Sequence, residues 1–159
     1  MIRNLIIIDK KGTNLLEVNF GECHSLAANP LVISSFISAI YAFGQSLNGR
    51  GIKNIRFEHL YFMLYTKKEF IFLISVDDDL ESENRAKLER ISSLFLEKYS
   101  QELREFEETN TPSDFTEFIN ILLDLDIAQK NCGEHPDCED CPNHRVLPLD
   151  EISKVFYDE

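Results

Sequence analysis

Five residues that can bind a metal ion lie close together near the C-terminal end of the chain. Three thiols and two imidazoles occur within thirteen residues, namely Cys132, His135, Cys138, Cys141 and His144. Cys138 and Cys141 are separated by two residues, a spacing that lets two thiolates bind one ion. Cys132 and His144 can complete a tetrahedron, with His135 as the alternate ligand. The spacing therefore predicts a closed, structural Zn²⁺ site.

The same residues have other interpretations. An iron–sulfur cluster is usually held by four thiolates. Reduced thiols, or one disulfide in an acidic tail, need no metal at all. Cys23 and His24 lie in a predicted loop and could be recruited to the site, although a small buried thiol and a loop imidazole explain them more simply.

The sequence contains none of the local patterns that build a catalytic centre. There is no glycine-rich phosphate loop ending in Lys-Ser/Thr, no nucleophile elbow and no His-Glu-x-x-His pair. The net charge of −12 repels phosphate backbones and anionic lipid headgroups. No apolar run reaches the length of a membrane span, and no signal peptide is recognisable. We therefore expect a cytoplasmic protein that is not an enzyme and that inserts into no membrane.

The elements that must position any site are predicted by hydrophobic periodicity. Residues 52–76 show three short strands in a meander, and the third, around residues 70–74, is apolar on both faces. Two earlier strands are predicted over residues 2–9 and 15–20. A central strand that is buried on both faces requires helices above and below the sheet.

Three helices are predicted to supply that cover. The first begins after Asn29, with Pro30 at its first position, and ends before Gly49. A long second helix starts near Ser82 and carries one apolar stripe as far as Phe106. A capping box over residues 111–114 is expected to open the third.

These elements predict one α+β domain over residues 1–130 and a Cys/His-rich tail over residues 131–159. The order β-β-α-β-β-β-α-α describes a five-stranded antiparallel sheet, with one helix on one face and two on the other. Residues 2–9 and 70–76 are expected to be adjacent central strands.

This order, the opening MIRNLIIIDKKG and the aromatic meander IRFEHLYFMLYTKKEFIFLISVDDD resemble the longin fold, also described as longin/profilin-like. The likeness covers about residues 1–127 and extends to the small chains of clathrin-type vesicle adaptors. The first helix, with NPLVISSFISAI, is more similar to archaeal longin or roadblock-type proteins. The Cys/His tail has no counterpart in an adaptor small chain.

The resemblance implies a docking domain in small-GTPase regulation or vesicle trafficking. Its expected partner is a small GTPase, another longin- or roadblock-like subunit, or a second copy of this chain. The alternative is a zinc-dependent regulatory or redox-sensing protein that acts through its tail. The apolar positions of the first helix span more than one sheet face can cover, so Leu31, Val32, Phe36 and Tyr41 are the first candidates for partner contact.

Overall fold

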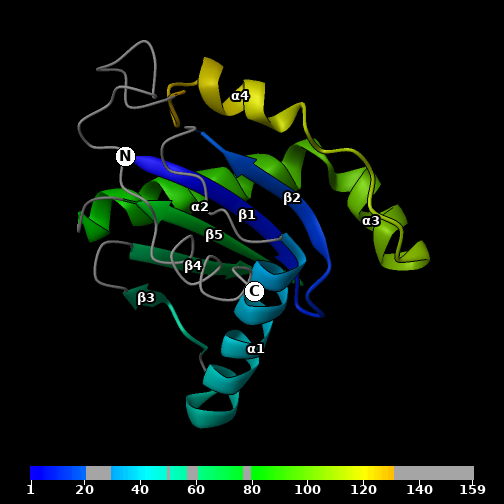
Figure 1. The fold of residues 1–159 in the computed structure, drawn as a ribbon. Helices are drawn as coiled ribbons and strands as arrows, with labels where there is room; N and C mark the ends of the chain where they lie inside the picture. The colour runs from blue at the N-terminus through cyan, green and yellow to red at the C-terminus, as the bar shows by residue number, and fades with distance from the viewer. Residues whose placement is uncertain (21–29, 50, 57–60, 77–79, 131–159) are drawn as a thin grey trace, which may run out of the picture.

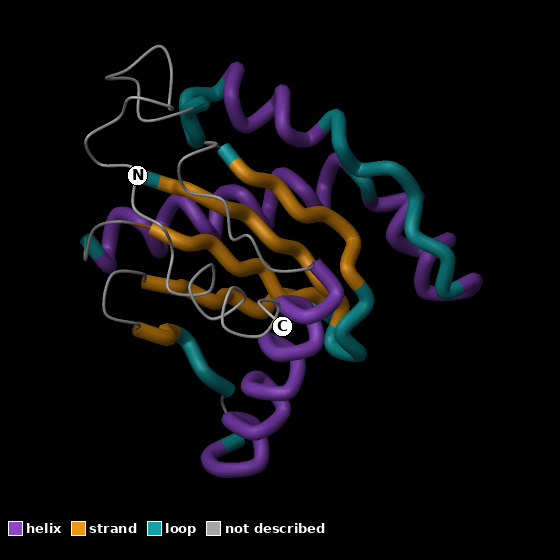
Figure 2. The backbone as a smooth tube through the Cα atoms, in the orientation of Figure 1, coloured by secondary structure: helices purple, strands orange, loops and turns teal. Residues whose placement is uncertain are grey.

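A computed structural model describes residues 1–20, 30–49, 51–56, 61–76 and 80–130 of the chain. These residues form a single antiparallel sheet with helices on both faces (Figure 1). The fold is α+β, with five strands and four helices in the described part. The tube in Figure 2 shows α1 crossing one face and α2 running behind the other.

The sheet has the spatial order β2-β1-β5-β4-β3, and every neighbouring pair is antiparallel. β1 and β5 lie side by side, with Ile7 opposite Phe72, so the prediction of two adjacent central strands is confirmed. The strands are β1 (Ile2–Asp9), β2 (Asn14–Asn19), β3 (Asn54–Arg56), β4 (Tyr61–Lys67) and β5 (Phe70–Val76).

Two hydrophobic cores lie on opposite faces because alternate residues of a strand point to opposite sides. The smaller core packs β-strand residues such as Ile6 and Leu73 against α1 (Pro30–Asn48). The larger core packs the other faces of β1 and β5 against the later helices. These helices are α2 (Glu81–Lys98), α3 (Ser100–Thr109) and α4 (Phe118–Asp124).

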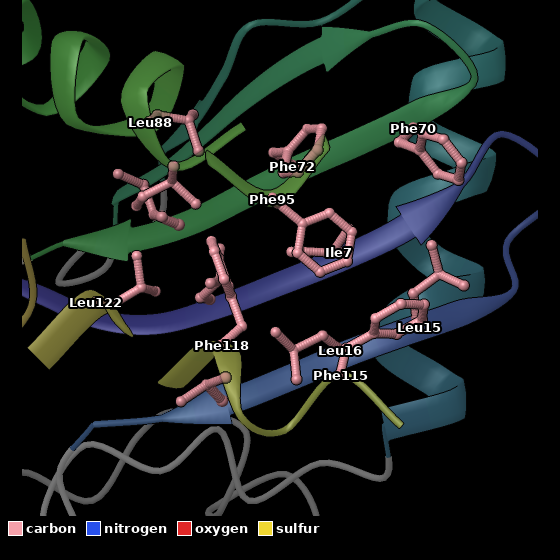
Figure 3. Close-up of a cluster of buried hydrophobic side chains, with 14 of the residues drawn as sticks. Ile7, Leu15, Leu16, Phe70, Phe72, Leu88, Phe95, Phe115, Phe118 and Leu122 are labelled. Carbon is pink, nitrogen blue, oxygen red and sulfur yellow. The ribbon is translucent and has the colours of Figure 1, made fainter. Parts of the chain in front are cut away.

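An aromatic cluster forms the centre of the larger core (Figure 3). The ring of Phe95 in α2 lies with its centroid 5.1 Å from Phe118, 5.2 Å from Phe115 and 5.9 Å from Phe72. Tilted and edge-on contacts at these separations are favourable beyond the area that they bury. This cluster ties α2 and the segment over residues 115–118 to the sheet.

The long second helix predicted from the sequence is two helices. The chain turns at Tyr99, whose φ of −106° and ψ of 27° interrupt the α-helical backbone between α2 and α3. The apolar stripe continues through the turn, since Phe95, Leu103 and Phe106 are all buried in the same core. The prediction was wrong because a helical period does not reveal a bend at which both arms keep contact with the core.

The third helix starts later than the predicted capping box. Asn110, in the left-handed conformation, ends α3, and α4 begins only at Phe118. Asp114 does not cap a helix; its carboxylate accepts hydrogen bonds from the backbone N–H and the hydroxyl of Thr116, at 2.9 and 2.7 Å. The larger core therefore has three helices where two were expected. No helix of the described residues is long and apolar enough to cross a membrane.

Candidate protein-interaction surface

Local sequence accounts for both ends of α1. Pro30 is its first residue, where the missing N–H costs nothing and the fixed φ favours the helix. Gly49, at φ +70°, follows its last residue and donates its N–H to the carbonyl of Gln45 at 2.8 Å. Between these limits the helix contains no charged residue, which is unusual for a helix at a protein surface.

The inner face of α1 packs on the sheet. Ile33, Ile37 and Tyr41 are buried in the smaller core. The hydroxyl of Tyr41 accepts a hydrogen bond from the side chain of Gln45 at 2.9 Å, which satisfies a polar group at the edge of that core. Gly44 is buried against residues 51–52, where an added Cβ would lie 2.6 Å from a side-chain carbon of Ile52. The C-terminal half of α1 is thus held tightly against the segment that leads into β3.

The outer face of α1 is apolar as well. Val32, Phe36, Phe43 and Leu47 are exposed by 61%, 45%, 59% and 68%. Their separations of four, seven and four residues place all four side chains on one side of a helix with 3.6 residues per turn. Large apolar side chains exposed singly are ordinary, but four along one uncharged helix form a continuous stripe. We call these four residues the α1 stripe.

The structure separates the four residues that the sequence named for partner contact. Val32 and Phe36 belong to the α1 stripe, whereas Tyr41 is buried between the helix and the sheet. The side chain of Leu31 lies outside the described residues. Phe43 and Leu47 were missed, although the absence of any charge from residues 30–48 was a signal that could have found them.

The predicted zinc ligands Cys132, Cys138, Cys141 and His144, the alternate ligand His135, and the loop residues Cys23 and His24 all lie outside the described residues. Within the described part of the chain, no three His, Cys, Asp or Glu side chains are grouped so that they could hold a metal ion. The zinc site stays a prediction.

The concave regions of the described surface include two that lie away from α1. The first lies beside the β4–β5 turn, where Lys10 pairs with Glu69 at 3.1 Å and Lys11 donates to the side chain of Asn110 at 3.4 Å. Two of its charged groups, Lys10 and Glu69, are therefore paired with each other. The second is a groove of about 580 Å³ between β2 and the start of α4.

The described titratable groups with altered pKa values do not converge on one point. Burial is the main cause that raises the pKa of Tyr99, assisted by the carboxylates of Glu117, Glu102 and Asp114. Burial also raises the pKa of Glu17 in β2, partly offset by the hydrogen bond from Asn14. The hydrogen bonds from Thr116 lower the pKa of Asp114. The described surface therefore presents a binding face more clearly than an acid–base pair.

Comparison of the chain with known proteins found similarity to solved structures but none to a protein-family model or a curated sequence. No protein-family model matches it, and no curated protein sequence matches it significantly. Among solved structures it is similar to the gliding protein MglB from Thermus thermophilus, with a TM-score of 0.38 and 15% identity over 48% of this chain. It is also similar to MglB with a tetrameric arrangement, with a TM-score of 0.32 and 16% identity over 48% of this chain. The matches span 61% and 60% of those two chains.

Proposed function

We propose that this protein is a non-catalytic interaction module that binds a protein partner across the α1 stripe and acts in small-GTPase regulation or vesicle trafficking. The observation that carries the proposal is the pair of apolar faces on α1. One face is used by the sheet, and the other displays Val32, Phe36, Phe43 and Leu47 to solvent without a charged neighbour in the helix.

The free energies of burial and of association favour a partner that covers more than the α1 stripe. Burying a large apolar side chain contributes about 1.5–3 kcal/mol, so four half-exposed ones contribute roughly 3–6 kcal/mol. Association itself costs about 4–15 kcal/mol in lost freedom. A specific complex therefore needs additional contact, on the order of 1,000 Å² in total. Residues 51–52, which lie against Gly44, and β3, which follows them, form a neighbouring surface that can supply it.

The partner classes are a small GTPase, another longin- or roadblock-like subunit, and a second copy of this chain. The resemblance of the sequence to longin and roadblock domains supports these classes. A chargeless helix face can pack against an apolar groove or against the same face of a second molecule, and either arrangement removes the stripe from water.

The test compares two substitutions that each add one negative charge to an exposed helical position. Phe43→Asp changes the α1 stripe, and Ala86→Asp changes the outer face of α2. Sedimentation of the full chain over a range of concentrations measures self-association. Affinity capture from the native host tests for a small GTPase or another longin- or roadblock-like subunit as the partner. Nucleotide-exchange assays with the recovered GTPases then test for regulation.

We expect Phe43→Asp to weaken partner binding at least tenfold while Ala86→Asp leaves it within twofold of wild type. Equal binding by both variants would show that α1 is not the interface. A chain that stays monomeric at high concentration, and that neither binds host GTPases nor changes their nucleotide exchange, would reject the proposed role.

The second candidate function is a zinc-dependent regulator or redox sensor that acts through residues 131–159. It is favoured by the three thiols and two imidazoles within thirteen residues of sequence. Elemental analysis of protein purified without added metal distinguishes it, because a structural site retains about one equivalent of zinc. Less than about a tenth of an equivalent, with Cys138→Ser leaving stability unchanged, would reject it.

A further inference from the structure

The two edges of the sheet are protected to different degrees. β3 is three residues long, and α2 contacts it: Asn54 donates to Glu81 at 2.9 Å and accepts from Arg85 at 3.1 Å. β2 is six residues long, and its outer side faces the groove beside α4. In Figure 1, α4 lies beside the C-terminal end of β2. A strand edge of this length is a template for pairing with another segment unless something covers it.

The hydrogen-bond pattern shows which part of β2 faces the groove. The N–H of Phe20 donates to the carbonyl of Arg3 at 2.8 Å, and Val18 is the partner of Leu5 two residues along the ladder. In an antiparallel pair, residues that bond to the neighbouring strand alternate with residues whose backbone groups point the other way. Glu17, between Leu16 and Val18, therefore directs its N–H and carbonyl to the outer edge.

The groove has two walls of different origin. Glu17 and Val18 of β2 form one wall, and Thr116, Glu117 and Ile119, at the start of α4, form the other. Lys130 also lines the groove. Ile119 is half-buried, so it adds some apolar surface to the backbone groups of the strand, whereas Val18 is almost fully buried in the larger core.

The two glutamates in the groove differ in whether they have a cationic partner among the described residues. Glu117 forms an ion pair with Lys98 at 3.4 Å. Glu17 is half-buried and accepts a hydrogen bond from Asn14 at 3.2 Å, but it forms no ion pair with a described residue. A carboxylate that has lost part of its hydration without gaining a cation is a site where a basic side chain binds favourably. The net charge of −12 strengthens the attraction for a basic segment.

We propose that the outer edge of β2 receives an extended, basic segment of a partner protein as a sixth strand. Backbone hydrogen bonds to Glu17 provide the pairing, and a Lys or Arg of the segment lies beside the Glu17 carboxylate. An apolar residue at an alternate position contacts Ile119. This surface is separate from the α1 stripe, so the inference stands whether or not the proposed function is correct.

The experiment selects ligands for the full chain from a library of random linear nonapeptides displayed on phage. The enriched sequences are expected to carry Lys or Arg between β-branched or aromatic residues at alternate positions. A synthetic peptide of that pattern is then titrated into the full chain, and amide hydrogen exchange is measured at Glu17. Binding is expected to slow exchange at Glu17 and leave exchange in α1 unchanged.

Three variants at one position separate charge from strand pairing. Glu17→Lys is expected to weaken peptide binding roughly fivefold or more, because an attractive cross-strand pair becomes repulsive. Glu17→Gln should weaken it less. Glu17→Pro, which removes the outward N–H at a position where an edge strand tolerates proline, should abolish detectable binding. Glu97→Lys on the exposed face of α2 changes the net charge equally and should alter binding less than twofold.

Several outcomes would overturn the proposal. These are a library that yields no enriched peptides, enriched peptides without a basic residue, and binding to Glu17→Pro at wild-type strength. If exchange at Glu17 is already slow in the free chain and depends on protein concentration, the occupant is a second copy. If it is slow at every concentration and becomes fast on substitutions within residues 131–159, the occupant is this chain's own tail.

Discussion

α1 and α2 cover opposite faces of the same sheet, but their outer faces differ in composition. The outer face of α2 is charged, with Glu83 and Lys87 paired at 2.7 Å one turn apart, and Glu97 exposed further along. The outer face of α1 displays the α1 stripe and no charge at all. An amphipathic helix such as α2 completes a protein surface, whereas a helix that is apolar on both faces calls for another layer of protein.

The two sides also differ in how their cores are built. α2 is joined by α3 and α4, and the rings of Phe95, Phe115 and Phe118 interlock between them. On the other side, α1 alone contributes helical residues to the smaller core of described residues. The larger core therefore explains the stability of the domain, and the exposed side of α1 is available for binding.

The largest expected effect is on the free energy of unfolding, when a buried phenylalanine of α2 rather than an exposed one of α1 is replaced. Phe95→Ala removes a fully buried ring that contacts four other aromatic rings, and it should lower the free energy of unfolding by about 3–5 kcal/mol. Phe43→Ala should lower it by less than about 1 kcal/mol, because the ring is mostly in solvent. Urea unfolding at pH 7 measures both. Similar losses would mean that the stripe belongs to the core of the domain.

A smaller effect is expected from Gly44, which is buried near the C-terminal end of α1. Gly44→Ala raises helix propensity by about 1 kcal/mol but places a Cβ 3.0 Å from the backbone nitrogen of Ile52. Because backbone cannot move aside easily, we expect a net loss of about 1–3 kcal/mol in unfolding free energy. Ser35→Ala, on the exposed face, is the control and should cause no loss. A more stable Gly44→Ala variant would show that residues 51–52 do not press on the helix.

The turn at Tyr99 provides a third test on the α2 side. Its hydroxyl oxygen is buried and has no hydrogen-bond partner among the described residues. Tyr99→Phe keeps the ring contacts with Phe95 and Phe115, so the free energy of unfolding at pH 7 should stay the same or rise by about 1 kcal/mol. Thermal unfolding measures the change. A loss greater than about 1 kcal/mol would indicate that the hydroxyl has a partner in the folded protein.

The difference in stability between Tyr99→Phe and the wild type should change at alkaline pH. Because burial raises the pKa of Tyr99, the stability that this group contributes is complete below the ordinary value of 10.0 and is lost as the pH rises through the raised one. The wild type should therefore lose stability above pH 10 through this group, and Tyr99→Phe should not lose that contribution.

The smallest expected effect concerns Glu17 at the β2 edge. Burial raises its pKa above 4.5, so its contribution to stability is complete below that value and is lost as the pH rises through the raised pKa. Glu17→Gln remains neutral and should be slightly more stable than the wild type at pH 7, with the difference disappearing near pH 4. Glu97→Gln, at an exposed position, should show no such difference. A Glu17→Gln variant that is less stable at pH 7 would show that the carboxylate already has a cationic partner.

Much of the fold could be predicted because the sheet follows from local patterns. Residues 70–74 are apolar at successive positions, which is typical of a strand covered on both faces, and all seven residues of β5 are buried. Alternation in β4 correctly separates Phe62 and Leu64, which face α1, from Met63, which faces the larger core. Pro30 and Gly49 mark the limits of α1 in the sequence as they do in the structure.

The candidate surface could be predicted only in part. The sequence shows that α1 has more apolar positions than one face of a sheet can cover, but not which of them the sheet uses. Helical spacing treats Phe36 and Tyr41 alike, and the structure exposes the first and buries the second. The rotation of a helix about its own axis depends on the shape of the surface beneath it, and here that surface comes from strands distant in sequence.

The sequence by itself determined the number of strands, the limits of α1 and the absence of charge from that helix. These features depend on residues that are neighbours along the chain, so local periodicity and end signals are sufficient. The tertiary structure alone decided the turn at Tyr99, the late start of α4, the choice of exposed residues on α1 and the groove beside Glu17. Each of these arises where segments distant in sequence compete for the same space, and close packing gives only one of the locally acceptable arrangements the lowest free energy.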